Sequence, residues 1–104
     1  MPSGRLGAID IAASTYTTVY TVPASKVAVF TVSICNRNTL PARIRLSLSS
    51  TTGTPSNSEF IEYETVVDAF GVLERTGIVL DATKVLTAYS DISGLSIVAF
   101  GYEE

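Results

Sequence analysis

The stretch Val27–Leu48, with the sequence VAVFTVSICNRNTLPARIRLSL, contains the two clearest strands of the chain. In residues 42–48, apolar side chains alternate with arginine and serine, which places one face of a strand on a core and the other in water. In residues 27–35 the second side is only mildly polar, so we expect this strand to be central or covered on both faces. A polar segment containing Pro41 separates the two strands. The stretch therefore predicts either a β-hairpin or a crossover between two sheets.

The rest of the chain continues this pattern of short apolar runs separated by turn residues. Further runs typical of strands occupy residues 8–13, 16–22, 59–67, 72–80, 84–89 and 95–102. Turn signals recur at roughly the 8–12-residue spacing of a sandwich or barrel, and no helical periodicity extends beyond about one turn. The sequence predicts an all-β fold, an antiparallel β-sandwich of about eight strands. Its topology is either jelly-roll or immunoglobulin-like.

A chain of 104 residues is expected to form one domain. Residues 1–7, MPSGRLG, contain two glycines and a proline, which predicts an extended N-terminal arm; residues 8–104 then form the single β-sandwich domain. Gly77 interrupts its strand and predicts a bulge or a close backbone approach. Residues 49–58 are polar and are expected to form an exposed loop, and residues 103–104 are expected to end the chain in water.

Charge is scarce and unevenly distributed. Charged residues make up 16% of the chain, below the roughly 25% of typical soluble domains. Either other subunits cover part of the surface, or the surface is rich in serine and threonine. Residues 1–52 carry five basic and one acidic side chain, whereas residues 53–104 carry two basic and nine acidic ones. Opposite halves of this kind can pair within one fold or between neighbours in an assembly.

The totals give no reason to expect nucleic-acid or membrane binding. The net charge is −3, which does not favour contact with nucleic acid. No apolar run approaches the roughly 20 residues that a membrane-spanning helix needs. Nothing resembles a signal peptide, so synthesis in the cytoplasm is the expectation.

Histidine is absent from the sequence and cysteine occurs once, which removes the commonest catalytic arrangements. There is no histidine, the commonest general base and metal ligand, and Cys35 is the only cysteine. We therefore predict no catalytic, cofactor-binding or metal-binding residues, no cofactor, and a protein that is not an enzyme. Cys35 cannot form an intrachain disulfide, and its place in a strand predicts a small, buried, reduced side chain.

The only cluster of acidic residues consists of Glu59, Glu62 and Glu64. Glu62 and Glu64 share a strand face, where they can bind calcium or act as paired carboxylates. We favour a third interpretation, a charge ladder with Arg43 and Arg45 on an antiparallel neighbouring strand. Such cross-strand pairs contribute roughly 0.2–1 kcal/mol each.

The tyrosines allow two interpretations. They can form a sugar-binding platform, or they can be core and sheet-face residues, as aromatic side chains in strands usually are. The five are Tyr16, Tyr20, Tyr63, Tyr89 and Tyr102.

Six segments carry a resemblance that extends over nearly the whole chain. They are GRLGAIDIAAST, YTVPASK, VSICNRN, IEYETV, GVLERTGIVLDATK and the terminal GYEE. Together they resemble a family of small virion structural proteins of tailed bacteriophages. The chain departs from the family pattern at Ser25 and Thr83, two turn positions where glycine is expected. The resemblance implies a non-enzymatic β-sandwich subunit of the tail, baseplate or neck, or a capsid decoration protein.

Residues and resemblance together predict a structural subunit of a virion, made in the host cytoplasm. We expect a homo-oligomer, a trimer or ring, that contacts other virion proteins through strand faces and the arm. Only the trimer depends on the resemblance, because low charge and the need to cover edge strands already favour an oligomer. The alternative is a carbohydrate- or cell-surface-binding module at a fibre or tail tip.

Overall fold

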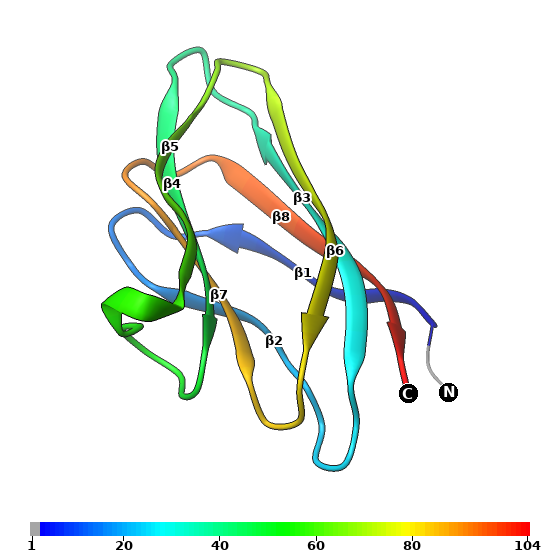
Figure 1. Ribbon diagram of the computed structural model, residues 1–104. Helices are drawn as coiled ribbons and strands as arrows, with labels where there is room; N and C mark the ends of the chain where they lie inside the picture. The colour runs from blue at the N-terminus through cyan, green and yellow to red at the C-terminus, as the bar shows by residue number, and fades with distance from the viewer. Residues whose placement is uncertain (1–2) are drawn as a thin grey trace.

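The computed structural model describes residues 3–104 and contains eight β-strands (Figure 1). Their bounds are β1 (Ser3–Ile11), β2 (Thr17–Thr21), β3 (Ala28–Asn36), β4 (Ala42–Ser49), β5 (Phe60–Val67), β6 (Val72–Leu80), β7 (Val85–Ser90) and β8 (Leu95–Glu103). One turn of 3₁₀-helix, η1 (Asn57–Glu59), precedes β5, and residues 3–104 contain no α-helix. The all-β prediction is confirmed. No helix within this range combines the length and the apolar character needed to cross a membrane.

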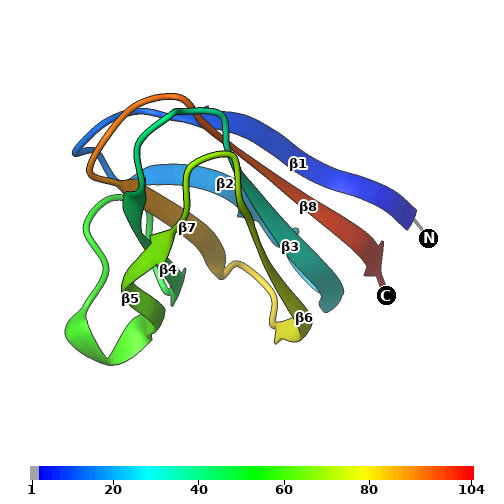
Figure 2. The ribbon, with the colours of Figure 1, turned by 90° about the horizontal axis from the view of Figure 1, so that it is seen from above.

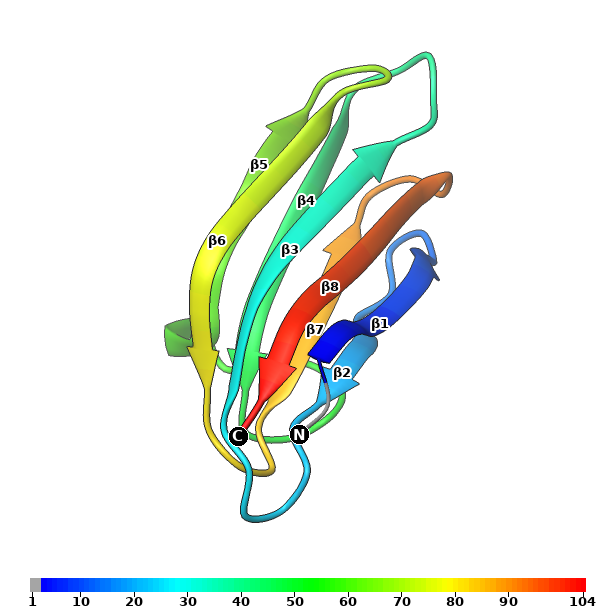
Figure 3. The ribbon, with the colours of Figure 1, turned by 90° about the vertical axis from the view of Figure 1, so that its right-hand side faces the viewer.

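The strands form two four-stranded antiparallel sheets, ordered β1-β8-β3-β6 and β2-β7-β4-β5. Figures 2 and 3 show the sheets as two layers that face each other. Consecutive strands lie in different sheets except for β4 and β5, so most connections cross the sandwich. This is the strand order of a jelly roll, and it excludes the immunoglobulin-like order, in which the first two strands share a sheet. The stretch Val27–Leu48 is accordingly a crossover from β3 to β4.

The core lies between the two sheets and consists of the apolar side chains that point inward from each strand. β3 is central, as predicted, with β8 on one side and β6 on the other. Burying each large apolar side chain contributes about 1.5–3 kcal/mol, so the two strands of the opening stretch account for much of the core. Their inward residues are at most 2% exposed: Ala28, Phe30, Val32, Ile34, Ala42, Ile44 and Leu46.

Residues 3–7, expected as part of an arm, instead form the first half of β1 and pair with the end of β8. Ser3 lies opposite Tyr102, and Arg5 lies opposite Phe100. The glycines hid this strand, because they interrupt the alternation that marks one. Gly7 is required where β1 passes β2, since a Cβ there would lie 2.5 Å from the carbonyl oxygen of Val19. Residues 1–2, the rest of the expected arm, lie outside the described residues.

The end of the chain is also held by the sheets: Glu103 is buried, contrary to the expectation that both terminal residues lie in water, whereas Glu104 is exposed as expected. Glu103 is only 7% exposed, and its carboxylate accepts a hydrogen bond from the hydroxyl of Tyr20 in the opposite sheet. Burial, and then this hydrogen bond, raise the pKa of Tyr20. The backbones of Val27 and Glu104 exchange two hydrogen bonds, of 2.8 and 3.1 Å. This pairing fastens the last two residues beside the start of β3.

The bulge of β6 follows a glycine signal of the sequence, whereas two turns form without the glycine that was expected there. The register of β3 with β6 shifts between Phe30 and Val32, opposite Gly77, whose φ is +71°. The predicted bulge is therefore confirmed. Ser25 and Thr83, where glycine was expected, adopt φ values of +64° and +70°. Both turns form, at the cost of a left-handed conformation that disfavours side chains with a Cβ.

A fully buried amide organises one end of the sandwich. Asn36, the last residue of β3, donates from Nδ2 to the carbonyl oxygens of Leu40, Val67 and Asp68 at 2.9–3.2 Å. Its Oδ1 accepts from the backbone N–H of Asn38 at 2.9 Å. One side chain thus joins the β3–β4 loop to the β5–β6 turn.

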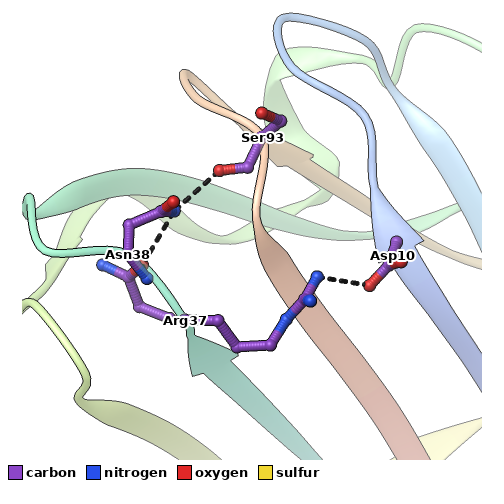
Figure 4. Close-up of polar contacts among 5 residues, drawn as sticks. Asp10, Arg37, Asn38 and Ser93 are labelled. Atoms are coloured by element: carbon purple, nitrogen blue, oxygen red, sulfur yellow. Dashed lines mark hydrogen bonds and ion pairs between the residues drawn. The ribbon is translucent and has the colours of Figure 1, made fainter.

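The same loop is also tied to the β7–β8 turn and to β1 (Figure 4). Asn38 donates to the carbonyl oxygen of Ser93 at 2.7 Å, and Arg37 pairs with Asp10 at 2.6 Å. These contacts fix the β3–β4 loop to the β7–β8 turn and to β1.

Candidate functional site

The outer face of the β2-β7-β4-β5 sheet carries aromatic side chains gathered around one arginine. The guanidinium carbon of Arg45 lies 4.5 Å from the ring centroids of both Tyr63 and Tyr89, and 6.0 Å from that of Tyr16. Arg45 is in β4, Tyr63 in β5 and Tyr89 in β7, while Tyr16 directly precedes β2. We call this group, together with two further residues of β5, the Arg45 cluster. Its members are Tyr16, Arg45, Phe60, Tyr63, Glu64 and Tyr89.

Strand register explains why these side chains meet. Arg45 lies directly opposite Tyr89 in the β4–β7 ladder. The β4–β5 register shifts between Ile44 and Leu46, so that Tyr63 and Glu64 together oppose Arg45. Glu64 occupies this bulge with a φ of +53°. Simple alternation predicts Tyr63 and Glu64 on opposite faces; the bulge brings both to Arg45 and overturns that expectation.

Hydrogen bonds hold the guanidinium in place and balance its charge. Arg45 donates from Nε to Oε2 of Glu64 at 2.8 Å and from Nη1 to the hydroxyl of Tyr16 at 2.6 Å. The bond to Glu64, and then the bond to Tyr16, raise the pKa of Arg45, which stays charged throughout the working pH range. Because Glu64 carries the opposite charge, the pair adds no net charge to this face.

The predicted charge ladder is confirmed for Arg45 and Glu64 and wrong for the other two members. Glu62 pairs with Arg75 of β6, in the other sheet, and also accepts from the hydroxyl of Thr65 at 2.7 Å. Arg43 lies opposite Val66 and forms no ion pair within residues 3–104. The bulges of β5 separate Glu62 from Glu64, so the two carboxylates serve different strands.

The third acidic residue, Glu59, belongs to the loop before β5. Its carboxylate accepts from the backbone N–H of Ser56 at 2.9 Å and from that of Ser50 at 3.0 Å. These bonds lower the pKa of Glu59, the one from Ser56 most strongly. Across the described part of the chain, no three His, Cys, Asp or Glu side chains are grouped so as to hold a metal ion. The three glutamates are thus dispersed over three separate structural contacts.

The five tyrosines divide between three places. Tyr16, Tyr63 and Tyr89 meet in the Arg45 cluster. Tyr20 is buried between the sheets, with its ring 5.9 Å from that of Phe30 and perpendicular to it. Tyr102 lies on β8, in the other sheet.

Sequence reasoning missed Phe60 as a member of the cluster. Its ring centroid lies 4.9 Å from that of Tyr63, at an interplanar angle of 78°, and 6.2 Å from that of Tyr16. In a regular strand, residues 60 and 63 point to opposite faces. A second register shift, between Leu46 and Ser47, brings Phe60 opposite Ser47. Phe60 can be found from the sequence only if aromatic residues near the acidic strand are considered without assuming regular alternation.

A hollow opens beside the Arg45 cluster. It has a volume of about 500 Å³ and is lined by Asn57 of η1 together with Phe60 and Tyr63 of β5. Tyr63 is 57% exposed, the most exposed tyrosine of residues 3–104. Aromatic rings beside an amide suit a ligand that has both apolar and hydrogen-bonding groups.

The outer face of the β1-β8-β3-β6 sheet carries a second feature, a group of apolar side chains of which three are exposed and one, Val29, is half-buried. Val29 lies opposite Val79 on one side and Tyr102 on the other, and Phe100 precedes Tyr102 by two residues on the same side of β8. Val79 is 61% exposed, Phe100 40% and Tyr102 39%. We call Val29, Val79, Phe100 and Tyr102 the apolar row.

Cys35 lies on this same outer side of β3, between Val72 and Ser96. It is a free cysteine of intermediate exposure, so the prediction that it is buried is wrong. β3 sends its even-numbered residues 28–34 into the core, and the odd-numbered Cys35 therefore faces outward.

No protein-family model matches this chain, and neither the curated proteins nor the solved structures contain a significant match. The resemblance to virion proteins therefore stays a prediction drawn from the sequence.

Proposed function

We propose that this protein is a non-enzymatic structural subunit of a tailed-bacteriophage virion. The observation that carries the assembly role is the apolar row on the outer face of the β1-β8-β3-β6 sheet. Apolar side chains gathered on one exposed face are a property of interaction surfaces, because a partner that covers them removes apolar surface from water. The sequence resemblance supports the virion as the place of assembly.

The composition around the apolar row fits a protein interface. Val79, Val29 and Tyr102 stand side by side on three adjacent strands, and none of them is charged. Charged residues lie toward the margins: Arg5 is opposite Phe100 on edge strand β1, and Glu74 is on edge strand β6. An apolar centre with a polar rim is the usual anatomy of an interface. Burial of the row contributes about 25 cal/mol per Å² of apolar surface.

The proposed assembly is a homo-oligomer, a trimer or ring, that also contacts neighbouring virion proteins. Closed symmetry lets every copy cover the same face without leaving an open chain of contacts. Because residues 3–7 pair with β8, the contacts are made by the sheet face and not by a free arm of seven residues. The subunit is made in the host cytoplasm and takes its place in the capsid, neck, tail or baseplate.

Sedimentation velocity over a range of concentrations tests this role. The wild-type protein is expected to associate as its concentration rises, and added salt is expected not to reverse this, because the row is apolar. Val79→Glu is expected to stay monomeric, since a charge in the row must be desolvated on association. Val66→Glu is the matched control, because Val66 is 51% exposed but lies in the opposite sheet. Equal loss of association in both variants, or a wild-type monomer at every concentration, contradicts the proposal.

The alternative, a carbohydrate- or cell-surface-binding module, depends on a different surface. The Arg45 cluster and its hollow, in the β2-β7-β4-β5 sheet, favour it.

A further inference from the structure

We infer that the hollow lined by Asn57, Phe60 and Tyr63 binds a neutral oligosaccharide. The inference does not rest on the proposed virion role. The hollow and the apolar row lie on the outer faces of opposite sheets, which the jelly roll points in opposite directions (Figure 2). A variant in one surface therefore leaves the other intact.

The aromatic part of the site is exposed and yet held in position. Tyr63 keeps 57% of its surface in solvent. At the same time its ring lies 4.5 Å from the Arg45 guanidinium and 4.9 Å from the ring of Phe60. A ring fixed in this way loses little conformational freedom when a ligand packs on it. The C–H faces of a pyranose ring are apolar surfaces of the right size for such packing.

The polar part of the site suits hydroxyl groups. The amide of Asn57 offers both a donor and an acceptor, and the hydroxyl of Tyr63 does the same. A sugar hydroxyl also donates and accepts, so these groups match it without a change of charge. Asn57 is positioned because Glu59, two residues later, accepts hydrogen bonds from Ser50 and Ser56 and so fixes the loop.

The absence of charged side chains from the lining of the hollow, among the described residues, favours a neutral ligand. Among the described residues, no charged side chain lines the hollow. The nearest cation in the cluster, Arg45, is bound by Glu64 at 2.8 Å. An anionic sugar would meet no unpaired cation here and would lie near a carboxylate. The volume of about 500 Å³ falls within the range of roughly 300–1,000 Å³ of small-ligand sites.

Titration of the ¹⁵N-labelled full chain by NMR tests the inference, with four neutral probes: cellohexaose, maltohexaose, mannohexaose and chitohexaose. At least one probe is expected to shift the backbone signals of residues 57–64 with a Kd in the millimolar range, about 4 kcal/mol of binding free energy. Tyr63→Ala is expected to weaken binding at least tenfold. Tyr63→Phe retains the ring and is expected to weaken it less than Tyr63→Ala does.

The matched control is Tyr102→Ala, which removes an exposed tyrosine from the opposite sheet. It is expected to bind the probe as the wild type does, and the circular dichroism spectrum of each variant checks its folding. The inference is overturned if none of the four probes shifts these signals at concentrations up to about 10 mM. It is also overturned if Tyr102→Ala loses as much affinity as Tyr63→Ala, or if only an anionic hexasaccharide, oligogalacturonate, binds.

Discussion

Tyr20 of β2 and Glu103, the last residue of β8, join the two sheets of the sandwich. A buried carboxylate needs a hydrogen-bond donor, and the Tyr20 hydroxyl supplies it. Tyr20→Phe keeps the ring against Phe30 but leaves the carboxylate without this partner. We expect the free energy of unfolding to fall by about 1–3 kcal/mol, measured by urea denaturation.

Tyr102→Phe serves as the control for that measurement, because Tyr102 is exposed on the outer face of β8. Its effect is expected to stay within about 0.5 kcal/mol. If the two variants are equally stable, the buried pair between the sheets has no energetic role.

Arg45 offers a second test, through its pairing with Glu64. A double-mutant cycle of Arg45→Ala and Glu64→Ala is expected to give a coupling free energy of about 0.5–1 kcal/mol, since both side chains are partly solvated. The control cycle combines Arg45→Ala with Glu62→Ala, which pairs with Arg75 instead. That cycle is expected to be additive. If the control cycle shows coupling and the Glu64 cycle shows none, Arg45 pairs with Glu62 and the β5 bulge described here is wrong.

These pairs show how far single residues could be assigned from the sequence. The pattern correctly brought Arg45 to the acidic strand, because opposite charges on neighbouring strands attract. It could not choose between Glu62 and Glu64, because that choice depends on a bulge with a non-glycine residue at positive φ. The pattern also predicted, wrongly, that Glu103 is exposed to water, because its partner Tyr20 lies 83 residues away in the chain.

The bulge of β6 was predictable, since Gly77 interrupts an otherwise continuous strand. At a φ of +71°, a Cβ at Gly77 would meet no atom within 4 Å, so substitution changes only the backbone energy. Gly77→Ala is expected to destabilise the protein by about 1–2 kcal/mol, measured by thermal or urea unfolding.

Gly77→Asn is the control, because asparagine tolerates the left-handed region better than alanine. It should cost less than Gly77→Ala. An alanine variant as stable as the wild type would show that β6 passes this point without a left-handed residue.

The stability of the β4–β5 loop is expected to decrease at acid pH, when Glu59 becomes protonated. Hydrogen bonds from Ser56 and Ser50 lower its pKa in the folded protein relative to the unfolded chain. The resulting stabilisation is present above the unfolded pKa and is lost as the pH falls through the lowered folded pKa. NMR is expected to show the Ser50 and Ser56 amide signals moving together in that acid range. Glu59→Gln, which cannot ionise, removes this joint titration; if the two signals still titrate in that variant, Glu59 is not their partner.

Strand positions were largely readable from the sequence, and strand partners were not. Seven of the eight expected runs match a strand to within about two residues, because alternation is a local property of the chain. β1 begins five residues before the predicted run at residue 8, because Gly4 and Gly7 break the pattern. The choice of a jelly roll depends on which distant strands pair, and alternation carries no such information.

The complete sandwich separates two surfaces that the sequence could not distinguish. The apolar row and the hollow beside Tyr63 belong to opposite sheets, so one molecule can assemble through one face and leave the other free. From the sequence the tyrosines could only be treated as one set, whereas the fold places Tyr102 in the apolar row and Tyr63 in the Arg45 cluster. This separation allows assembly and ligand binding to be tested independently.

The proposed virion role is tested most directly by electron cryo-microscopy of intact particles of the phage to which the proposal assigns this protein. The expected result is repeated, symmetry-related copies of the jelly roll in the particle, each with Val29, Val79, Phe100 and Tyr102 covered by a neighbouring subunit. Particles that lack the chain, or copies in which this row faces solvent throughout, would contradict it.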